Sequence, residues 1–271
     1  MGTVGTALVI VAVAGFALIW WGQRSLIYHP SGAEPSIDQA PQDAEEIALT
    51  TADDVDLTAW FVPPSPEADR GQAVLYMPGN AGDRSSRSGI GGELSDRGFG
   101  VLLLEYRGFG GNPGSPSEAG LASDARAGLE ALQDRDYGLD DLIYMGESLG
   151  TGVAAGLHRE EPPAGLVLRS PFTDLAALGQ EHYPILPVGL LLRDEYPVLD
   201  QVRASGVPTT IIYGDDDDVV PPAQSREVAE AAGADAVEEL EFDDAGHNDP
   251  VMFGPEVADA VQRLAEEVEG R

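Results

Sequence analysis

Cysteine is absent from this 271-residue chain, which excludes disulfides, zinc–thiolate sites and a thiol nucleophile. Lysine is also absent, so all fifteen basic residues are arginine, and 47 acidic residues give a formal net charge of −32. Because such a surface would repel a phosphate backbone, we expect no nucleic-acid partner. Neither a glycine-rich phosphate loop nor an H-E-x-x-H motif occurs, and we expect neither a metal nor an organic cofactor.

The acidic residues are spread over most of the chain rather than gathered in one tail. This pattern is typical of a solvated acidic surface, whose self-repulsion is suppressed in molar salt because the screening length falls to about 3 Å. We therefore expect a halophilic source. A moderately acidic protein from a GC-rich genome is the alternative, and it would also explain the missing lysine.

Residues 4–21 (VGTALVIVAVAGFALIWW) contain no charged side chain. At a helical rise of about 1.5 Å per residue the run spans about 27 Å, close to the hydrocarbon thickness of a bilayer. Trp20 and Trp21 fit an interfacial aromatic belt, so we predict a single-pass transmembrane anchor. A cleaved signal peptide is the alternative, but residues 1–3 lack the basic side chain that such a peptide needs. Arg24, directly after the run, favours a cytoplasmic catalytic domain.

Residues 30–44 are rich in proline, serine and acidic side chains, and they predict a linker without packed structure. From residue 45 to 271, short apolar runs alternate with helical patterns, which favours a mostly parallel sheet covered on both faces. Strands are predicted at 45–50, 56–62, 73–77, 100–104, 141–145, 165–169, 208–213 and 237–242, the first two as a hairpin. In such a sheet, function gathers at the loops that leave the C-terminal strand ends.

One stretch, residues 173–200, is longer than a single crossover helix between two strands requires. Pro184, Pro187 and Pro197 forbid one continuous helix there, because proline lacks the N–H that the helix interior needs. This stretch therefore predicts a small cap that faces the substrate.

The pentapeptide 146–150 (GESLG) fits the G-x-S-x-G motif, and it directly follows the predicted strand 141–145 and opens a helical pattern. A nucleophile elbow requires this setting, because the serine takes a strained turn that projects its hydroxyl above the sheet. The flanking glycines avoid Cβ clashes, and the helix N-terminus favours developing negative charge. We predict that Ser148 is the nucleophile. A glycine-rich turn of packing value alone is the alternative.

A serine nucleophile needs a base, which at neutral pH is usually histidine. Three of the four histidines are poorly placed: His29 precedes the domain, His158 lies on the helix after the elbow, and His182 lies in the cap. His247 follows the last strand and satisfies the chain order of serine, acid and histidine, so we predict that it is the base.

The acid must lie between Ser148 and His247 in the chain, where residues 215–218 are four consecutive aspartates. Chemistry alone does not choose among them, and a plain acidic turn or a cation-binding loop is the alternative for at least three. The oxyanion of a tetrahedral intermediate also needs two backbone N–H donors, each contributing about 3–4 kcal/mol. Leu149, after the nucleophile, supplies one, and Asn80, in the turn after the first buried strand, supplies the other.

With these residues in place, the chain from about residue 45 onward resembles the serine hydrolases of the α/β-hydrolase family, in particular the membrane-anchored branch with protein depalmitoylases and serine-aminopeptidase-like esterases. The resemblance rests on the segments 78–83, 105–121, 146–154, 170–175, 183–202, 214–222 and 245–249. It implies an α/β-hydrolase fold, with a mostly parallel eight-stranded sheet, helices on both faces and a small cap, preceded by one transmembrane helix.

The resemblance also implies a choice among the four aspartates. The acid of this family stands three residues after the glycine that ends a strand and four before a proline, which are Gly214 and Pro221 here, so Asp217 is the expected acid. Many relatives have histidine where this chain has Pro78, but the backbone donor of Asn80 is unaffected by that change.

These features predict acyl transfer through an acyl-serine, with a carboxylic ester or thioester as substrate. The anchor and the apolar cap suggest acyl chains or lipid-proximal substrates. An amide hydrolase of the serine aminopeptidase type is one alternative. A non-catalytic binding scaffold is another, although the complete set Ser148, Asp217 and His247 argues against it. The sequence predicts no oligomeric state.

Overall fold

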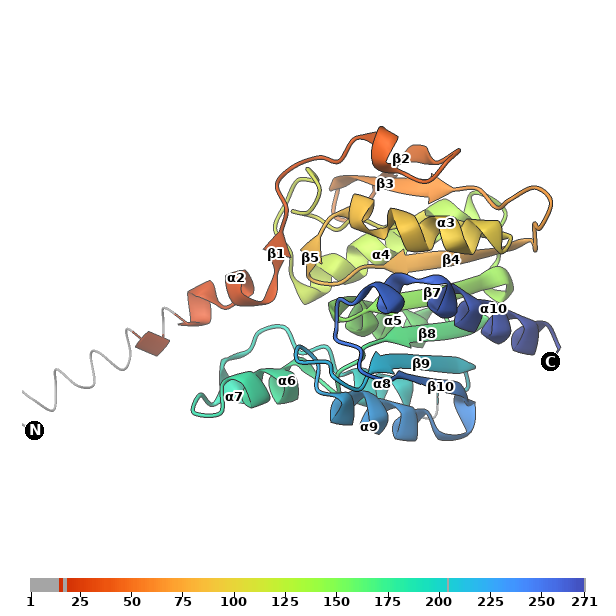
Figure 1. Cartoon of the computed structure of the whole chain (residues 1–271). Coiled ribbons are helices and arrows are strands. Elements are labelled where there is room, and N and C mark those ends of the chain that lie inside the picture. The colour runs from red at the N-terminus through yellow and green to blue at the C-terminus, as the bar shows by residue number, and fades with distance from the viewer. Residues whose placement is uncertain (1–14, 17–18, 204, 271) are drawn as a thin grey trace, which may run out of the picture.

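The computed structural model describes residues 15–16, 19–203 and 205–270. Its described part contains an eight-stranded sheet in the order β10-β9-β8-β7-β4-β6-β3-β2, and a separate pair of short strands (Figure 1). The strands of the large sheet are β2 (Glu45–Thr50), β3 (Asp56–Val62), β4 (Gln72–Met77), β6 (Phe99–Leu103), β7 (Leu142–Glu147), β8 (Gly165–Arg169), β9 (Thr209–Gly214) and β10 (Ala236–Phe242). Each coincides with a predicted strand to within a residue or two.

The sheet is parallel from β6 across to β10, while β2 and β3 form the predicted antiparallel hairpin at the other edge. Every residue of β4 and β7 is buried, because helices cover both faces of the central strands. Because these strands are parallel, their carboxyl ends all lie along the same side of the sheet. The loops that follow these carboxyl ends carry the candidate site.

Helices form two layers on the sheet. Side chains of α4, α5, α8 and α9 pack against one face, and those of α3 and α10 pack against the other (Figure 1). The helices of the described residues with stated bounds are α2 (Arg24–Ile27), α3 (Ser88–Asp96), α4 (Glu118–Gln133), α5 (Leu149–Glu160), α6 (Leu175–His182), α7 (Val188–Leu191), α8 (Val198–Val202), α9 (Pro222–Ala232) and α10 (Pro255–Glu269).

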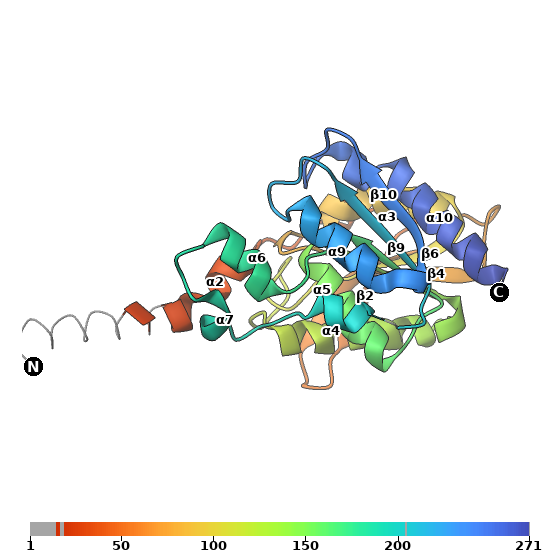
Figure 2. The ribbon, with the colours of Figure 1, turned by 90° about the horizontal axis from the view of Figure 1, so that it is seen from below.

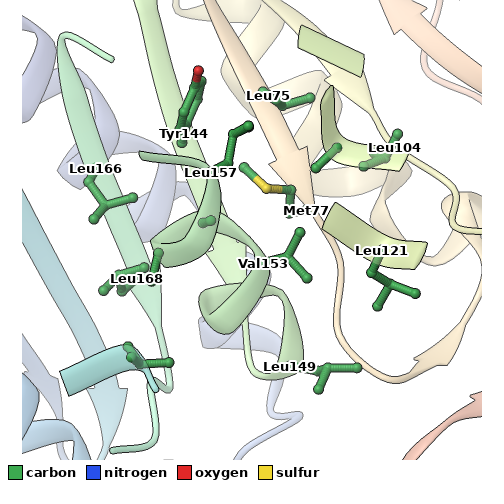
Figure 3. Close-up of a cluster of buried hydrophobic side chains, with 14 of the residues drawn as sticks. Leu75, Met77, Leu104, Leu121, Tyr144, Leu149, Val153, Leu157, Leu166 and Leu168 are labelled. Carbon is green, nitrogen blue, oxygen red and sulfur yellow. The ribbon is translucent and has the colours of Figure 1, made fainter. Parts of the chain in front are cut away.

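The core alternates between the faces with the two-residue period of a strand. Leu75 and Met77 of β4 belong to the cluster on the α5 side, whereas Val74 of the same strand belongs to the cluster on the α10 side. Figure 3 shows Val153 and Leu157 of α5 directed toward the side chains of the central strands. This packing fixes α5, and with it the turn from which α5 starts.

Residues 30–44, expected to lack packed structure, lie against the domain at several points. The short strand β1 (His29–Pro30) pairs with β5 (Ala81–Gly82) in parallel. The Ser31 hydroxyl donates a 3.1 Å hydrogen bond to the carbonyl of Gly82. Farther along, the Ser88 hydroxyl donates to the carbonyl of Gln39 at 2.6 Å. The segment is thus irregular but packed, because its backbone finds partners on the domain.

Residues 173–200 contain α6, α7 and the start of α8, and prolines separate these short helices. Figures 1 and 2 show α2 beside α6 and α7 at one end of the molecule. Within the described ranges no helix is both long and apolar enough to cross a membrane. Most of the predicted anchor 4–21, namely residues 4–14 and 17–18, lies outside the described residues. The anchor therefore stays a prediction.

Candidate active site

The turn between β7 and α5 holds Ser148 in a backbone conformation that is rare for a residue with a side chain, with φ 51° and ψ −116°. Its N–H donates a 2.8 Å hydrogen bond to the carbonyl of Arg169. A Cβ on Gly146 would lie 2.5 Å from the carbonyl oxygen of Gly150, and one on Gly150 would lie 2.0 Å from that of Met77. The two glycines are therefore sterically required, and the predicted strand–turn–helix setting is present.

Asp217 and His247 come together from the loops that follow β9 and β10. His247 Nδ1 lies 2.7 Å from Asp217 Oδ2, and both residues are buried. The other carboxylate oxygen of Asp217 accepts the N–H groups of Val219 and Val220 at 2.9 and 2.8 Å. Burial by itself would raise the pKa of Asp217, but the bond to His247 and these N–H groups outweigh it and lower that pKa. The carboxylate is therefore charged at neutral pH.

Asp217 differs from its aspartate neighbours in burial: Asp217 is buried, whereas residues 215, 216 and 218 are all exposed. The histidines also differ. His158 Nδ1 bonds the carbonyl of Ala155 at 2.6 Å, and His182 Nε2 bonds that of Val219 at 2.8 Å. Of the four histidines, all within the described residues, His247 is the one paired with a carboxylate.

Ser148 opens onto a pocket of about 450 Å³. Asn80 and Leu149 line the same pocket, and most of the remaining wall is apolar. The other lining residues come largely from the cap and from the segment around α2: Ile19, Gln23, Leu26, Ile27, Phe172, Leu175, Leu178, Gly179, His182, Tyr183, Leu186, Val188, Leu191, Leu192 and Val219. A chain of methylene groups suits such a wall better than a charged group does.

Asn80 has its side chain and carbonyl engaged. The side-chain amide donates to the carbonyl of Ile27 at 2.9 Å, and the carbonyl accepts the N–H of His29 at 2.9 Å. These bonds fix the turn without using the backbone N–H of Asn80. Leu149 is the first residue of α5, where a backbone N–H has no carbonyl partner inside the helix. Both N–H groups are thus suited to hold an oxyanion.

A buried ionic cluster, which the motifs did not predict, lies directly behind the elbow. The carboxylate of Glu147 accepts hydrogen bonds from Arg87 Nε at 3.0 Å and from the Tyr76 hydroxyl at 2.7 Å, and Arg169 Nη2 lies 3.1 Å from it. Burial would raise the pKa of Glu147, but Arg87 and Arg169 lower it to about 2. The available signal was a charged residue at the end of each of two buried strands, Glu147 of β7 and Arg169 of β8.

Arg169 connects the two halves of the site. Its carbonyl accepts the N–H of Ser148, and its Nη1 donates to the carbonyl of His247 at 2.9 Å. The guanidinium also stacks 4.4 Å from the ring centre of Phe253. The backbone of Arg169 therefore holds the serine turn and its side chain holds the histidine loop, while Glu147 neutralises the buried guanidinium.

The chain is similar to several known proteins. Residues 69–193 match the family described as serine aminopeptidase, S33. The uncharacterized protein Rv2307c of Mycobacterium tuberculosis is 43% identical over 265 residues, which cover 96% of this chain and 94% of that protein. The chain belongs to the α/β-hydrolase family of serine hydrolases. As an α/β-hydrolase it has many structural relatives: the esterase Pf2001 of Pyrococcus furiosus has a TM-score of 0.70 at 20% identity, over 90% of this chain and 98% of that one.

A further relative of this α/β-hydrolase has a lipid substrate in its name. The lysophosphatidylserine lipase ABHD12 of Xenopus tropicalis is 35% identical over 173 residues. The match covers 55% of this chain and 43% of the lipase.

Proposed function

We propose that this protein hydrolyses a carboxylic ester or thioester through an acyl-serine intermediate. Ser148 is the nucleophile, His247 the general base and Asp217 the acid that orients His247. The backbone N–H groups of Asn80 and Leu149 hold the oxyanion. The observation that carries the proposal is the buried 2.7 Å hydrogen bond between His247 and Asp217, at the sheet edge where the strained Ser148 turn opens onto a pocket.

The reaction has two halves. Ser148 Oγ forms a bond to the carbonyl carbon of the substrate while His247 takes the hydroxyl proton. His247 then gives this proton to the leaving alcohol or thiol as its bond to the carbonyl carbon breaks. Water then adds to the acyl carbon while His247 takes its proton. His247 returns this proton to Ser148 Oγ as the bond between Oγ and the acyl carbon breaks, and the carboxylic acid leaves. The charged Asp217 stabilises the imidazolium that exists in each half.

The pocket wall supports an acyl chain as the recognised part of the substrate. No aspartate or glutamate is among the described residues that line it. A peptidase that removes N-terminal residues must bind an α-ammonium group, for which a carboxylate is the usual partner. The family description still supports an amide hydrolase of the aminopeptidase type as the second candidate. The name of the lysophosphatidylserine lipase relative supports an acyl ester.

The same proposal includes a membrane as partner, through the apolar segment 4–21. The described end of this segment supports it, because 81% of Trp21 is exposed. Nearby in the cap, Ile185 and Leu190 are 95% and 80% exposed. Large apolar side chains at one end of a strongly acidic molecule are typical of a lipid-facing surface.

A fluorophosphonate probe followed by mass spectrometry tests the catalytic assignment. We expect an adduct on Ser148 in the full chain in molar KCl, and none in Ser148→Ala. Acyl esters and thioesters of graded length, compared with aminoacyl amides, then separate the two candidate activities. A folded sample without an adduct would contradict the enzyme proposal and leave a non-catalytic binding scaffold.

A further inference from the structure

The segment that enters the domain, residues 19–28, forms part of the pocket that Ser148 opens onto. Ile19, Gln23, Leu26 and Ile27 all line it, together with residues of the cap such as Leu191. The segment lies before β2, the first strand of the eight-stranded sheet, so the strands and crossover helices do not require it there. Its place in the pocket wall instead depends on specific contacts with the cap.

Asp194, at the end of the cap, is the centre of these contacts, and it is 2% exposed. Arg24 donates to both of its carboxylate oxygens, from Nε and Nη2, at 2.9 Å each. The Tyr28 hydroxyl also donates to Asp194 at 3.1 Å and lies 2.9 Å from the hydroxyl of Tyr196. A buried carboxylate needs partners of this kind, because an unpaired buried charge is strongly unfavourable.

Gln23, directly before Arg24, makes a second attachment to the cap. Its side-chain amide donates to the carbonyl of Leu191 at 2.9 Å, and its side-chain oxygen accepts the N–H of Arg193 at 2.8 Å. On the other side, the carbonyl of Ile27 accepts the amide of Asn80, the oxyanion residue. The segment is thus attached to the cap by side chains and to the oxyanion turn by its backbone.

The cap side of the attachment reaches the elbow helix. A Cβ on Gly152 of α5 would lie 2.6 Å from Cδ1 of Tyr196, so ring and helix are in direct contact. The N–H groups of Glu195 and Tyr196 donate to the carboxylate of Glu118 at the start of α4. The cluster around Asp194 therefore rests on the rigid part of the fold, and the N-terminal segment is the part that it holds.

We propose that residues 19–28 are the acyl-length-determining wall of the pocket, and that Arg24 and Tyr28 hold this wall against the cap through Asp194. Leu26 meets the distal part of a long acyl chain, while a short acyl group at Ser148 does not reach it. Arg24 acts as a positioning residue. The proposal rests on the proposed ester or thioester hydrolysis, and it adds that the membrane-proximal segment sets chain-length preference.

The test compares Leu26→Trp with Ser25→Trp in the full chain, using p-nitrophenyl esters from acetyl to palmitoyl. Both side chains are exposed, Leu26 to 61%, but Leu26 lines the pocket and its neighbour Ser25 does not. We expect Leu26→Trp to lower the ratio of long-chain to short-chain kcat/KM about tenfold or more, because a filled apolar pocket excludes methylene groups. Ser25→Trp should leave this ratio within about twofold of the parent value. Equal ratios in both variants would overturn the proposal.

Arg24→Gln tests the attachment, with Arg159→Gln, an exposed arginine on α5, as the matched control for lost charge. We expect Arg24→Gln to raise KM for long-chain esters about tenfold while kcat changes less than about threefold, since the wall is displaced but the reacting groups are not. A uniform fall in kcat for all esters would mean a general structural role and would contradict the proposal. Fluorophosphonate labelling of Ser148 in the parent reports the catalytic proposal separately.

Discussion

Among single residues, the two glycines of the Ser148 motif are needed for steric reasons. Gly150 lies so close to the carbonyl of Met77 that a Cβ would be 2.0 Å from the oxygen, and both belong to backbone that the sheet holds in place. We predict that Gly150→Ala costs about 3 kcal/mol or more and abolishes fluorophosphonate labelling. Gly156→Ala, on the same helix, is the control.

The control differs only in its surroundings. A Cβ on Gly156 would meet nothing nearer than the side-chain nitrogen of Gln201 at 3.8 Å. Alanine has the higher helix propensity, so we expect Gly156→Ala to gain up to about 1 kcal/mol in thermal or denaturant unfolding and to keep its labelling. If both variants behaved alike, the steric account of the elbow would be wrong.

Asp217 can be tested against its own neighbours. Asparagine at 217 would keep the shape of the side chain but would not stabilise the imidazolium of His247, so we predict that Asp217→Asn lowers kcat about 10³–10⁴-fold. Asp216→Asn and Asp218→Asn remove the same charge from exposed positions one residue away. They should stay within about twofold of the parent in ester hydrolysis. A comparable loss in either neighbour would shift the acid assignment away from Asp217.

The buried carboxylate of Glu147 should make the stability of the protein depend on pH. Its pKa is lowered from 4.5 to about 2 by Arg87 and Arg169, so the stabilisation exists above about pH 4.5 and is lost as pH falls toward 2. We expect Glu147→Gln to cost about 3–5 kcal/mol at pH 7, because two buried guanidiniums lose their counter-charge. The difference from the parent in free energy of unfolding should shrink between pH 5 and the acid limit of folding.

The comparison variant for this measurement is Glu130→Gln, which changes an exposed glutamate on α4. Its effect should stay below about 0.5 kcal/mol at both pH 7 and acid pH. A parent–Glu147→Gln difference that is independent of pH would argue against a charged Glu147 in the folded protein.

At the scale of elements, the cap presents apolar side chains to solvent on the side where the N-terminal segment leaves the domain. Ile185 and Leu190 do not line the pocket, so their exposure serves no packing role within the described chain. We predict that the double change Ile185→Asp and Leu190→Asp lowers hydrolysis of a long-chain ester in vesicles about a hundredfold or more, because each buried apolar side chain contributes about 1.5–3 kcal/mol at a lipid surface and about 1.4 kcal/mol is a factor of ten. Hydrolysis of a soluble short ester serves as the reference.

Ile37 provides the matched change elsewhere, because it is 41% exposed in the turn Ile37–Gln39, outside the cap. Ile37→Asp should not alter the ratio of vesicle to soluble activity. If the double cap variant kept the parent ratio, the cap surface would not face the lipid.

For the whole molecule, the net charge is the main reason to expect that stability depends on salt. A formal charge of −32 on 271 residues makes the compact state repel itself unless salt screens it. We predict that the midpoint of thermal unfolding rises by about 10 °C or more between 0.1 and about 2 M KCl. Sulfate and sucrose would separate charge screening from general exclusion of solute. A midpoint that did not rise with KCl would contradict the halophilic interpretation and favour the GC-rich alternative.

Local patterns in the sequence were enough to predict the strands, the turn at Ser148 and the candidate base. The strands could be predicted because β4 and β7 are buried on both faces, so each appears in the sequence as a short apolar run between helical patterns. The turn at Ser148 could be predicted because its motif is local: Ser148 and its flanking glycines are a few residues apart. His247 followed from chain order among only four histidines. For Asp217 the residues alone left four choices, and family resemblance was needed to choose.

The contacts between segments far apart in the chain follow from the fold and not from local patterns. Glu147 occupies a variable position of the motif, and nothing local indicates that Arg87, 60 residues earlier, neutralises it. Residues 30–44 looked like an unpacked linker because composition does not reveal backbone partners on the domain. Likewise Arg24 and Asp194 are 170 residues apart, and their pairing depends on how the cap folds back over the pocket. Local patterns specify elements, whereas burial and charge pairing depend on which elements the folded chain brings together.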